Sequence, residues 1–245
     1  MVSLSHWTSS AYAVRSVRMS YASRQTSRRW ALALAVVVAC FLGFSVPPYL
    51  AGGTRVPATF WLHYPLLVFH VMFASVAMVA AVVQIWPRLR TSHPALHRRC
   101  GRIYVVAALP AAVSAMVIGA VTPFGPLLAV SNVTLGALWL WFTARGYAAA
   151  RGRRISEHRR NMVRSAALAL SVITNRIWTP VIYVSFQPLQ DNVFGGNAEH
   201  FQWFAAGVGA WLGWTVPLGI VQWWLTRRAV TASSSNRQLT ETPHV

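Results

Sequence analysis

A single guanidinium lies deep inside a long hydrophobic segment, and it is the side chain most suggestive of chemistry. Arg176 lies within the segment Met162 to Phe186, which is long enough to cross a bilayer. An arginine at the centre of a membrane helix costs about 2.5–3.5 kcal/mol on insertion scales, so such a residue usually has a partner or a task. We expect Arg176 and its neighbour Asn175 to form part of a polar site buried among helices.

A histidine in another hydrophobic segment is expected at the same depth. Arg176 follows Met162 by 14 residues and His70 precedes Trp86 by 16, which places them about 21 Å and about 24 Å from the same membrane face. His70 would therefore share a polar layer with Asn175 and Arg176 in the outer half of the membrane. Pro180 lacks an N–H group, so it should free the carbonyl of Arg176 and kink the helix.

The charge of Arg176 must be balanced by another group. The acids available on the outer side are Asp191 and Glu199. A salt bridge to one of them would close the outer loop over the bundle, whereas an anionic ligand would make Arg176 a binding residue. Backbone carbonyls and water are a further alternative. The sequence leaves these alternatives open.

Two similar basic motifs precede two of the hydrophobic segments. They read HRRCGRIY at 97–104 and HRRNMVRS at 158–165. Free N–H groups at the start of a helix, together with arginine side chains, form a good site for a phosphate, a lipid headgroup or a carboxylate. The candidate ligands are His97, Arg98, Arg102, His158, Arg159 and Arg164. The alternative is that these arginines only set the topology and extend to water.

The histidines also suggest a redox function, because membrane bundles can hold haem b between facing histidines. His97 with His158 would be the inner pair of ligands, and His70 or His63 with His200 the outer pair. The inner pair lies at the membrane edge, and no helix carries two histidines 13 or 14 residues apart. These two facts disfavour a two-haem protein.

The elements that must position these residues are membrane-spanning helices. Hydrophobic residues form 55% of the 245 residues and charged residues 11%, which is typical of a polytopic membrane protein. We predict an all-α bundle with six spans, at Trp30–Leu50, Leu62–Trp86, Ile103–Thr122, Leu127–Ala144, Met162–Phe186 and Trp203–Leu225. Residues 30–226 would form this domain, with an Arg/Ser-rich tail at 1–29 and a polar tail at 227–245.

The arginines predict the orientation of the bundle. All 22 basic residues are arginine, and on this span assignment nearly all outside the spans fall on one side, with Arg55 on the other. Positively charged loops stay in the cytoplasm during insertion. Both termini are therefore predicted to be cytoplasmic, in a plasma membrane. Arginine without lysine, among abundant alanine and valine, further suggests a bacterial protein.

At the two motifs the chain resembles a family of bacterial multi-pass membrane proteins, domain of unknown function 2306. The resemblance covers about residues 60 to 225. Matching positions are His97, Arg98, Gly101, Arg102 and Tyr104 in the first motif, and His158, Arg159, Met162, Arg164, Ser165 and the later Arg176 in the second. Asn161 departs from the family pattern, in which an aromatic residue follows the second His-Arg pair. The resemblance implies a membrane bundle and no particular activity.

Several function classes remain after the composition is considered. The net charge of +18 follows from topology, so we expect a bilayer with anionic headgroups as the partner and no nucleic acid. No metal site is expected, because the four acids are scattered. Hydrolase and transferase motifs are absent, so enzymatic activity is uncertain. The remaining hypotheses are binding or transport of a small anion or lipid, a non-catalytic regulatory or scaffold role, and electron transfer through haem b.

Two glycines in the last segment predict close helix packing. Gly209 and Gly213 form a small-xxx-small step, which lets another backbone approach closely. Packing within the bundle is the simpler interpretation. A homodimer through Gly209 and Gly213 is the alternative.

Overall fold

The structure is a computed structural model that describes residues 28–86, 89 and 92–241. Six helices in this part of the chain are long and apolar enough to cross a membrane, and the first of them is Arg28–Leu50. The described residues contain helices, turns and loops and no strand. The prediction of an all-helical membrane bundle is therefore confirmed. The predicted tail at 1–29 lies outside the described residues except for its last two.

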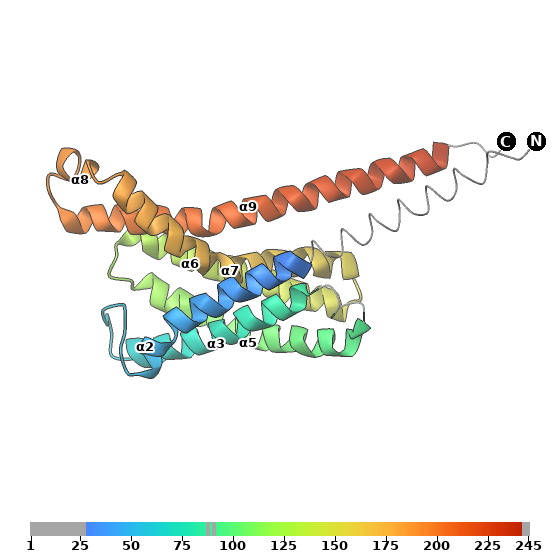
Figure 1. Ribbon diagram of the computed structural model, residues 1–245, viewed down its shortest axis with the longest axis horizontal. Coiled ribbons are helices and arrows are strands. Elements are labelled where there is room, and N and C mark those ends of the chain that lie inside the picture. Colours follow the sequence, from blue (N-terminus) through green and yellow to red (C-terminus); the bar gives the residue numbers. More distant parts are fainter. Residues whose placement is uncertain (1–27, 87–88, 90–91, 242–245) are drawn as a thin grey trace, which may run out of the picture.

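The helices follow one another up and down the bundle (Figure 1). The short α2 forms the end of the first span, and α8 lies in the loop between α7 and α9. Their order is α2 (Pro47–Leu50), α3 (His63–Ile85), α5 (Pro94–Ala120), α6 (Pro126–Arg151), α7 (Ile155–Ser185), α8 (Leu189–Asn192) and α9 (Ala198–Glu241).

Four of the helices extend seven or more residues further than the predicted spans, and one of them is α6, which continues past Ala144 to Arg151. α5 and α7 begin nine and seven residues before the expected starts at Ile103 and Met162, and α9 continues past Leu225 to Glu241. A span predicted from hydropathy includes only the residues that suit hydrocarbon, whereas a helix continues into water when its polar residues allow it. Both basic motifs therefore lie within helices, and residues 227–241 of the predicted polar tail continue α9.

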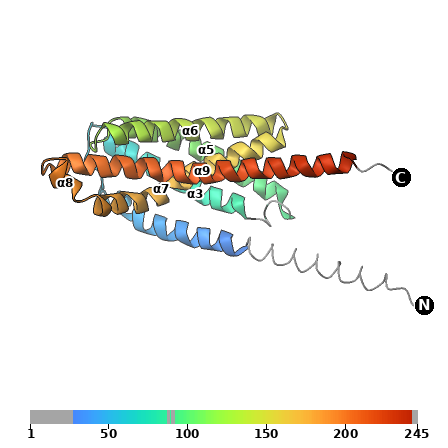
Figure 2. The ribbon, with the colours of Figure 1, turned by 90° about the horizontal axis from the view of Figure 1, so that it is seen from above.

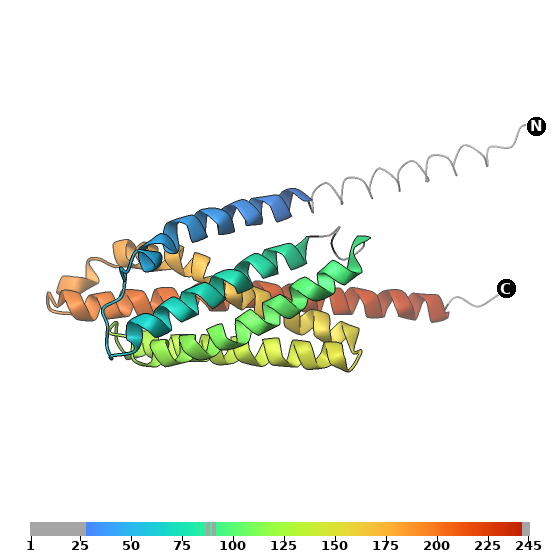
Figure 3. The same cartoon turned by 90° about the horizontal axis from the view of Figure 1, so that it is seen from below.

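Each long helix packs mainly against its neighbours in the sequence, α3 against α5, α5 against α6, and α6 against α7, while α9 packs against both α7 and α6. The first span lies on the opposite side of the bundle from α6 (Figures 2 and 3). It packs through Val38 against Met78 and Val82 of α3, with Ile173 of α7 at the same cluster. The core between α3, α5 and α6 is rich in alanine, which allows these helices to approach closely.

The two glycines of the last span pack α9 against α7. A Cβ atom on Gly209 would lie 2.6 Å from the Cα of Thr179, and one on Gly213 would lie 2.8 Å from the Cα of Asn175. The intramolecular interpretation of the small-xxx-small step is therefore confirmed. A homodimer through these two glycines would require α7 to leave this position, and the homodimer stays a prediction.

Most of the described arginines gather where α5 and α7 begin and α6 ends. We call this the basic end; its arginines are Arg98, Arg99, Arg102, Arg145, Arg151, Arg153, Arg154, Arg159, Arg160 and Arg164. The opposite end holds α2, α8 and the start of α9, on the other side of the bundle (Figure 1). Arg55, Asp191 and Glu199 belong to that opposite end.

Candidate functional site

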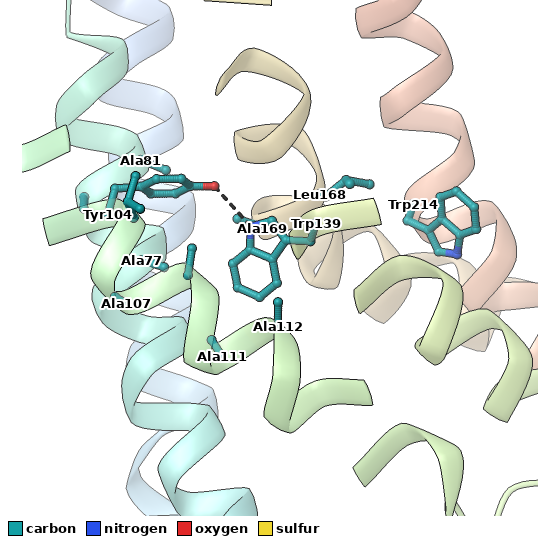
Figure 4. Close-up of a cluster of buried hydrophobic side chains, with 13 residues drawn as sticks. Ala77, Ala81, Tyr104, Ala107, Ala111, Ala112, Trp139, Leu168, Ala169 and Trp214 are labelled. Atoms are coloured by element: carbon teal, nitrogen blue, oxygen red, sulfur yellow. Dashed lines mark hydrogen bonds between the residues drawn. The ribbon is translucent and has the colours of Figure 1, made fainter. Parts of the chain in front are cut away.

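A buried hydrogen-bonded pair joins the two basic motifs. Tyr104 ends the first motif on α5, Ser165 ends the second on α7, and Tyr104 Oη lies 2.6 Å from Ser165 Oγ. The indole N–H of Trp139 on α6 donates to Tyr104 Oη at 3.1 Å, a bond that is visible in Figure 4. Ser165 Oγ also lies 2.6 Å from Thr143 Oγ1. All four side chains are buried, with at most 6% of their surface exposed.

The hydroxyl hydrogens of this cluster can all be used in one consistent direction. Trp139 donates to Tyr104, which can donate to Ser165, and Ser165 can donate to Thr143. Thr143 Oγ1 in turn donates to the carbonyl oxygen of Trp139 at 2.7 Å. No donor hydrogen in the cluster is left without an acceptor, so the network satisfies the requirement that buried polar groups be hydrogen-bonded. The cluster holds α5, α6 and α7 in one arrangement.

The histidines of the two motifs, His97 and His158, lie between this cluster and the basic end of the bundle. His97 precedes Tyr104 by seven residues and His158 precedes Ser165 by seven. Seven residues are nearly two helical turns, so each histidine shares a helix face with its partner in the cluster, about 10 Å away. Because Tyr104 and Ser165 meet and the two helices run in the same direction, the histidines lie at similar depth.

The tautomer of His158 follows from its hydrogen bond. His158 Nδ1 lies 2.8 Å from the carbonyl oxygen of Gly146 on α6. A carbonyl oxygen only accepts, so Nδ1 carries the hydrogen, and Nε2 of the neutral ring has its lone pair available. Gly146 leaves room for the Met162 side chain at this contact, because a Cβ atom there would lie 2.6 Å from Sδ of Met162.

A polar contact with α3 positions the first motif. The side-chain amide of Gln84 donates from Nε2 to the carbonyl oxygen of His97 at 2.6 Å. Gly101 lies beside the same amide, since a Cβ atom at this position would lie 3.4 Å from Gln84 Nε2, in ordinary contact. Gln84 therefore connects the end of α3 to the first turn of α5.

A tight turn positions the second motif. Arg153 has a positive φ of 57°. The N–H of Arg153 donates to the carbonyl of Ala150 and that of Arg154 to the carbonyl of Ala149. These two bonds are those of a Schellman motif, which ends α6 at Arg151, and three residues separate it from the start of α7 at Ile155. His158 follows as the fourth residue of α7.

Some arginine side chains of the two motifs are hydrogen-bonded within the protein, and others are not. Arg164 is occupied, because it donates to Gln222 Oε1 of α9 at 2.8 Å and 3.1 Å and lies 3.4 Å from Asn161 Oδ1. Arg98, Arg102 and Arg159 are exposed, and no ion pair or hydrogen bond joins their side chains to other described residues.

The one described carboxylate near these arginines is already paired. Glu157 Oε2 lies 3.1 Å from Arg154, and Glu157 Oε1 lies 3.9 Å from Arg145. Asp191 and Glu199 lie at the opposite end of the bundle. The described part of the basic end therefore holds a large excess of positive charge.

We expected free backbone N–H groups at the two motif histidines to help bind an anion, and this expectation is wrong. The N–H of His97 already donates to the carbonyl of His93, and that of His158 donates to the carbonyl of Arg154. The physical reason is that α5 and α7 begin three residues earlier, so each motif histidine lies at the end of the first turn. The motifs contribute side chains rather than free amide groups.

The outer polar layer is not assembled as a single site. His70 Nδ1 lies 2.9 Å from the carbonyl oxygen of Ala111 and 3.3 Å from Ser114 Oγ, both on α5. Asn175 faces α9 at Gly213, and its Oδ1 accepts a bond from Thr179 at 3.0 Å. These two residues of similar depth face different helices because they lie at different angles around their own helices.

Arg176 is exposed, so the expectation that it lies buried among helices is wrong. None of the described ion pairs or hydrogen bonds involves its guanidinium, and Asp191 and Glu199 do not contact it. The predicted salt bridge that would close the outer loop is therefore absent from the described residues. Arg176 projects from α7 on a face that the other described helices do not cover.

The proposed outer haem pairs are not brought together either. His63 is buried with 1% exposure, and its Nδ1 lies 3.0 Å from Thr59 Oγ1 of the preceding loop. His200 is exposed at the start of α9, and its ring lies 5.3 Å from that of Trp203. His63 and His200 therefore contact residues close to them in the sequence. No group of three or more potential metal ligands occurs among the described residues.

Residues 67–225 match the family described as predicted membrane protein, domain of unknown function 2306. The chain belongs to this family. The match includes both basic motifs, α5, α6 and α7 in full and the membrane-spanning part of α9. No curated protein and no solved structure matches the chain.

The prediction of the site missed the residues that hold the motifs together. Thr143, Trp139, Gln84 and Gln222 each bond to a motif residue or to its partner. No short sequence pattern marks them. The seven-residue spacing from His97 to Tyr104, and from His158 to Ser165, was a usable signal because it places each pair on one helix face.

Proposed function

We propose that this plasma-membrane protein binds anionic phospholipid headgroups at its basic end, with Arg98 and Arg102 of α5 and Arg159 of α7 as the ligands. The observation that carries the proposal is their unpartnered charge: all three are exposed, and the nearby carboxylate of Glu157 is paired with Arg154 and Arg145. Guanidinium groups bind phosphate oxygens through paired N–H donors, which makes phosphate the natural anion for this surface.

The buried cluster supports this role, because it fixes the arginines of two helices relative to each other. The bond between Tyr104 and Ser165 ties the third turn of α5 to that of α7. A site whose ligands are already in place pays less entropy when it binds. Arginines near an anionic membrane surface contribute about 1 kcal/mol each to attraction.

Binding would occur on the cytoplasmic side in this proposal. Positively charged segments remain in the cytoplasm, so the basic end and both termini would face that side. In a bacterial plasma membrane, anionic phospholipids would supply the headgroups. The protein would then be a lipid-binding or lipid-regulated membrane protein.

The test compares lipid binding in nanodiscs. The full-length protein would be placed in phosphatidylcholine nanodiscs, and anionic phosphatidylglycerol would be titrated while thermal stability is measured. We expect phosphatidylglycerol to raise the melting temperature, and this rise to be lost in the variant with Arg98→Gln, Arg102→Gln and Arg159→Gln. High salt should reduce the effect, since exposed charges are screened within about 8–10 Å.

Arg154→Gln combined with Arg145→Gln is the matched control. These arginines lie at the same end, but their charge is already balanced in part by Glu157. The control should keep most of the response to phosphatidylglycerol. An equal response in the protein and in the triple variant would show that the motifs only hold the bundle together, as the scaffold hypothesis requires.

A second candidate function, binding of haem b, is favoured by one specific observation. His158 and His70 each place Nδ1 within 2.9 Å of a backbone carbonyl oxygen, which leaves Nε2 of the neutral ring unprotonated. Histidines that ligate metals commonly donate their other N–H to a carbonyl in this way. The protein purified from haem-supplemented cells should then show a Soret band, and His158→Ala should reduce it. A spectrum with the protein bands alone contradicts haem binding.

A further inference from the structure

Arg176 presents a charge to the membrane from the outer half of α7. It precedes Ser185, the last residue of α7, by nine residues, or about 14 Å along the helix. Its neighbours Ile177 and Val184 are 59% and 70% exposed. Apolar side chains with this exposure on a spanning helix face acyl chains, so the guanidinium emerges from a surface covered by lipid.

The first span does not cover this charge. Ile173, one turn before Arg176, packs at the cluster around Val38 of the first span, which also includes Leu170 and Val172 of α7. Arg176 lies one turn beyond the α7 residues of that cluster. The charge therefore lies beside the outer edge of the contact between the first span and α7.

The described residues supply no counter-charge for Arg176. The described ion pairs involve Glu157 at the basic end, and Arg176 makes no hydrogen bond to another described residue. A charged group in the membrane needs an anionic or hydrogen-bonding partner, since hydrocarbon provides neither. Long arginine side chains reach toward the headgroup region to find one.

The backbone beside Arg176 provides a hydrogen-bond acceptor as well. Pro180 lies within α7, four residues after Arg176, and has no N–H. The carbonyl of Arg176 therefore lacks its usual helical donor. Carbonyl groups point toward the end of their helix, which for α7 is the outer side. Arg176 thus offers donors from its side chain and an acceptor from its backbone on the same part of the helix.

We infer that Arg176 binds the phosphodiester of an outer-leaflet phospholipid, with its guanidinium on the phosphate oxygens and its carbonyl accepting from a headgroup ammonium or hydroxyl. The lipid would lie against the face of α7 on which Ile177, Val181 and Val184 are also exposed. This site is independent of the basic end. It requires a phosphate rather than a net negative headgroup.

The experiment uses native mass spectrometry of the full-length protein in detergent. The probe is phosphatidylethanolamine, which has a phosphate, an ammonium group and no net charge. A galactosyl diacylglycerol with the same acyl chains is the phosphate-free comparison. We expect retention of one phosphatidylethanolamine to become about tenfold weaker in Arg176→Gln, and retention of the galactolipid to be unchanged.

Two variants keep the test decisive. Arg55→Gln removes a charge at the same end, but its guanidinium already donates to the carbonyl of Phe44 at 2.9 Å and lies over the ring of Phe44. It should retain phosphatidylethanolamine as the parent does. Arg176→Lys keeps the charge and should retain the lipid even if Arg176→Gln does not fold.

Three results would overturn the inference. One is equal retention of phosphatidylethanolamine by the parent and by folded Arg176→Gln. Another is loss of the lipid in Arg176→Lys. The third is a dimer that Arg176→Gln abolishes, which would assign the residue to a protein partner. Failure of the basic-end proposal is a separate result, because it appears as an absent response to phosphatidylglycerol and leaves phosphatidylethanolamine retention unaffected.

Discussion

The two basic motifs contain side chains with two different roles, because some connect the helices and others carry exposed charge. Tyr104 and Ser165 are buried and bonded to each other, whereas Arg98, Arg102 and Arg159 are exposed. Each motif therefore has an inner face that locks helices together and an outer face that carries charge. The contribution of the buried bond to stability and that of the exposed arginines to binding can be tested separately, because they involve different residues.

Removing a hydroxyl group from the buried cluster should destabilise the bundle. Tyr104→Phe and Ser165→Ala each leave a buried polar group without its partner, which costs about 1–3 kcal/mol. The double variant should cost less than the sum, because both changes break the same bond. Unfolding free energies of the three variants in detergent would measure this coupling.

Tyr147→Phe is the control for that prediction. The Tyr147 ring is 38% exposed, and its hydroxyl lies 3.5 Å from Arg151 at the surface. Its removal should change stability by less than about 0.5 kcal/mol. Fully additive losses in the double variant would show that Tyr104 and Ser165 act independently and would contradict the proposed network.

Among the elements, α7 has the largest role in assembling the bundle. It carries the second motif, packs against α6 and α9, and contacts α3 and the first span. Glycines on α9 let the two backbones approach closely at Thr179 and Asn175. The hydroxyl of Thr174 donates to the carbonyl of Gly213 at the same interface. The α7–α9 contact therefore depends on small residues at fixed positions.

Adding a methyl group at this interface should separate the two helices. Gly209→Ala places a Cβ atom 2.6 Å from the backbone of Thr179, which cannot move aside as a flexible side chain would. We expect a loss of about 1–3 kcal/mol, the usual cost of overpacking. Thermal unfolding in detergent would measure it.

Gly219→Ala is the matched control on the same helix. Nothing lies within 4 Å of a Cβ atom at Gly219, and alanine favours a helix over glycine by about 1 kcal/mol. This variant should be as stable as the parent or more stable. A similar loss of stability in both variants would contradict a specific contact at Gly209.

For the whole molecule, the main feature is the separation of charge between its two ends. The described arginines gather at the basic end, whereas Asp191 and Glu199 lie at the other end with Arg55. Six spans return the chain to the side where it started, since each pair of spans crosses the membrane twice. The fold alone leaves open which compartment each end faces, and the positive-inside rule supplies that expectation.

The orientation can be tested by cysteine labelling in intact cells. In a background with Cys40→Ser and Cys100→Ser, Thr54→Cys at the outer end should react with a membrane-impermeant maleimide. Arg153→Cys at the basic end should react only after the cells are lysed. Labelling of Arg153→Cys in intact cells would reverse the orientation and remove the cytoplasmic lipid site from the proposal.

The sequence by itself determined the architecture of this protein. Runs of about 20 apolar residues can hydrogen-bond their backbones in hydrocarbon only as helices, so six spans follow from composition and length. The small-xxx-small spacing of Gly209 and Gly213 also indicated close helix packing, because residues without bulky side chains let another backbone approach. The two motifs were recognisable because each begins with His-Arg-Arg, at His97 and at His158, and contains one more arginine before a hydrophobic segment.

Only the tertiary structure decided which of these polar residues meet. His70, Asn175 and Arg176 share a depth, but they point to α5, to α9 and away from the bundle because depth along a helix does not set the angle around it. Tyr104 and Ser165 are 61 residues apart and meet because α5 and α7 both pack against α6. Partners of this kind depend on how helices pack, which spacing within one segment does not specify.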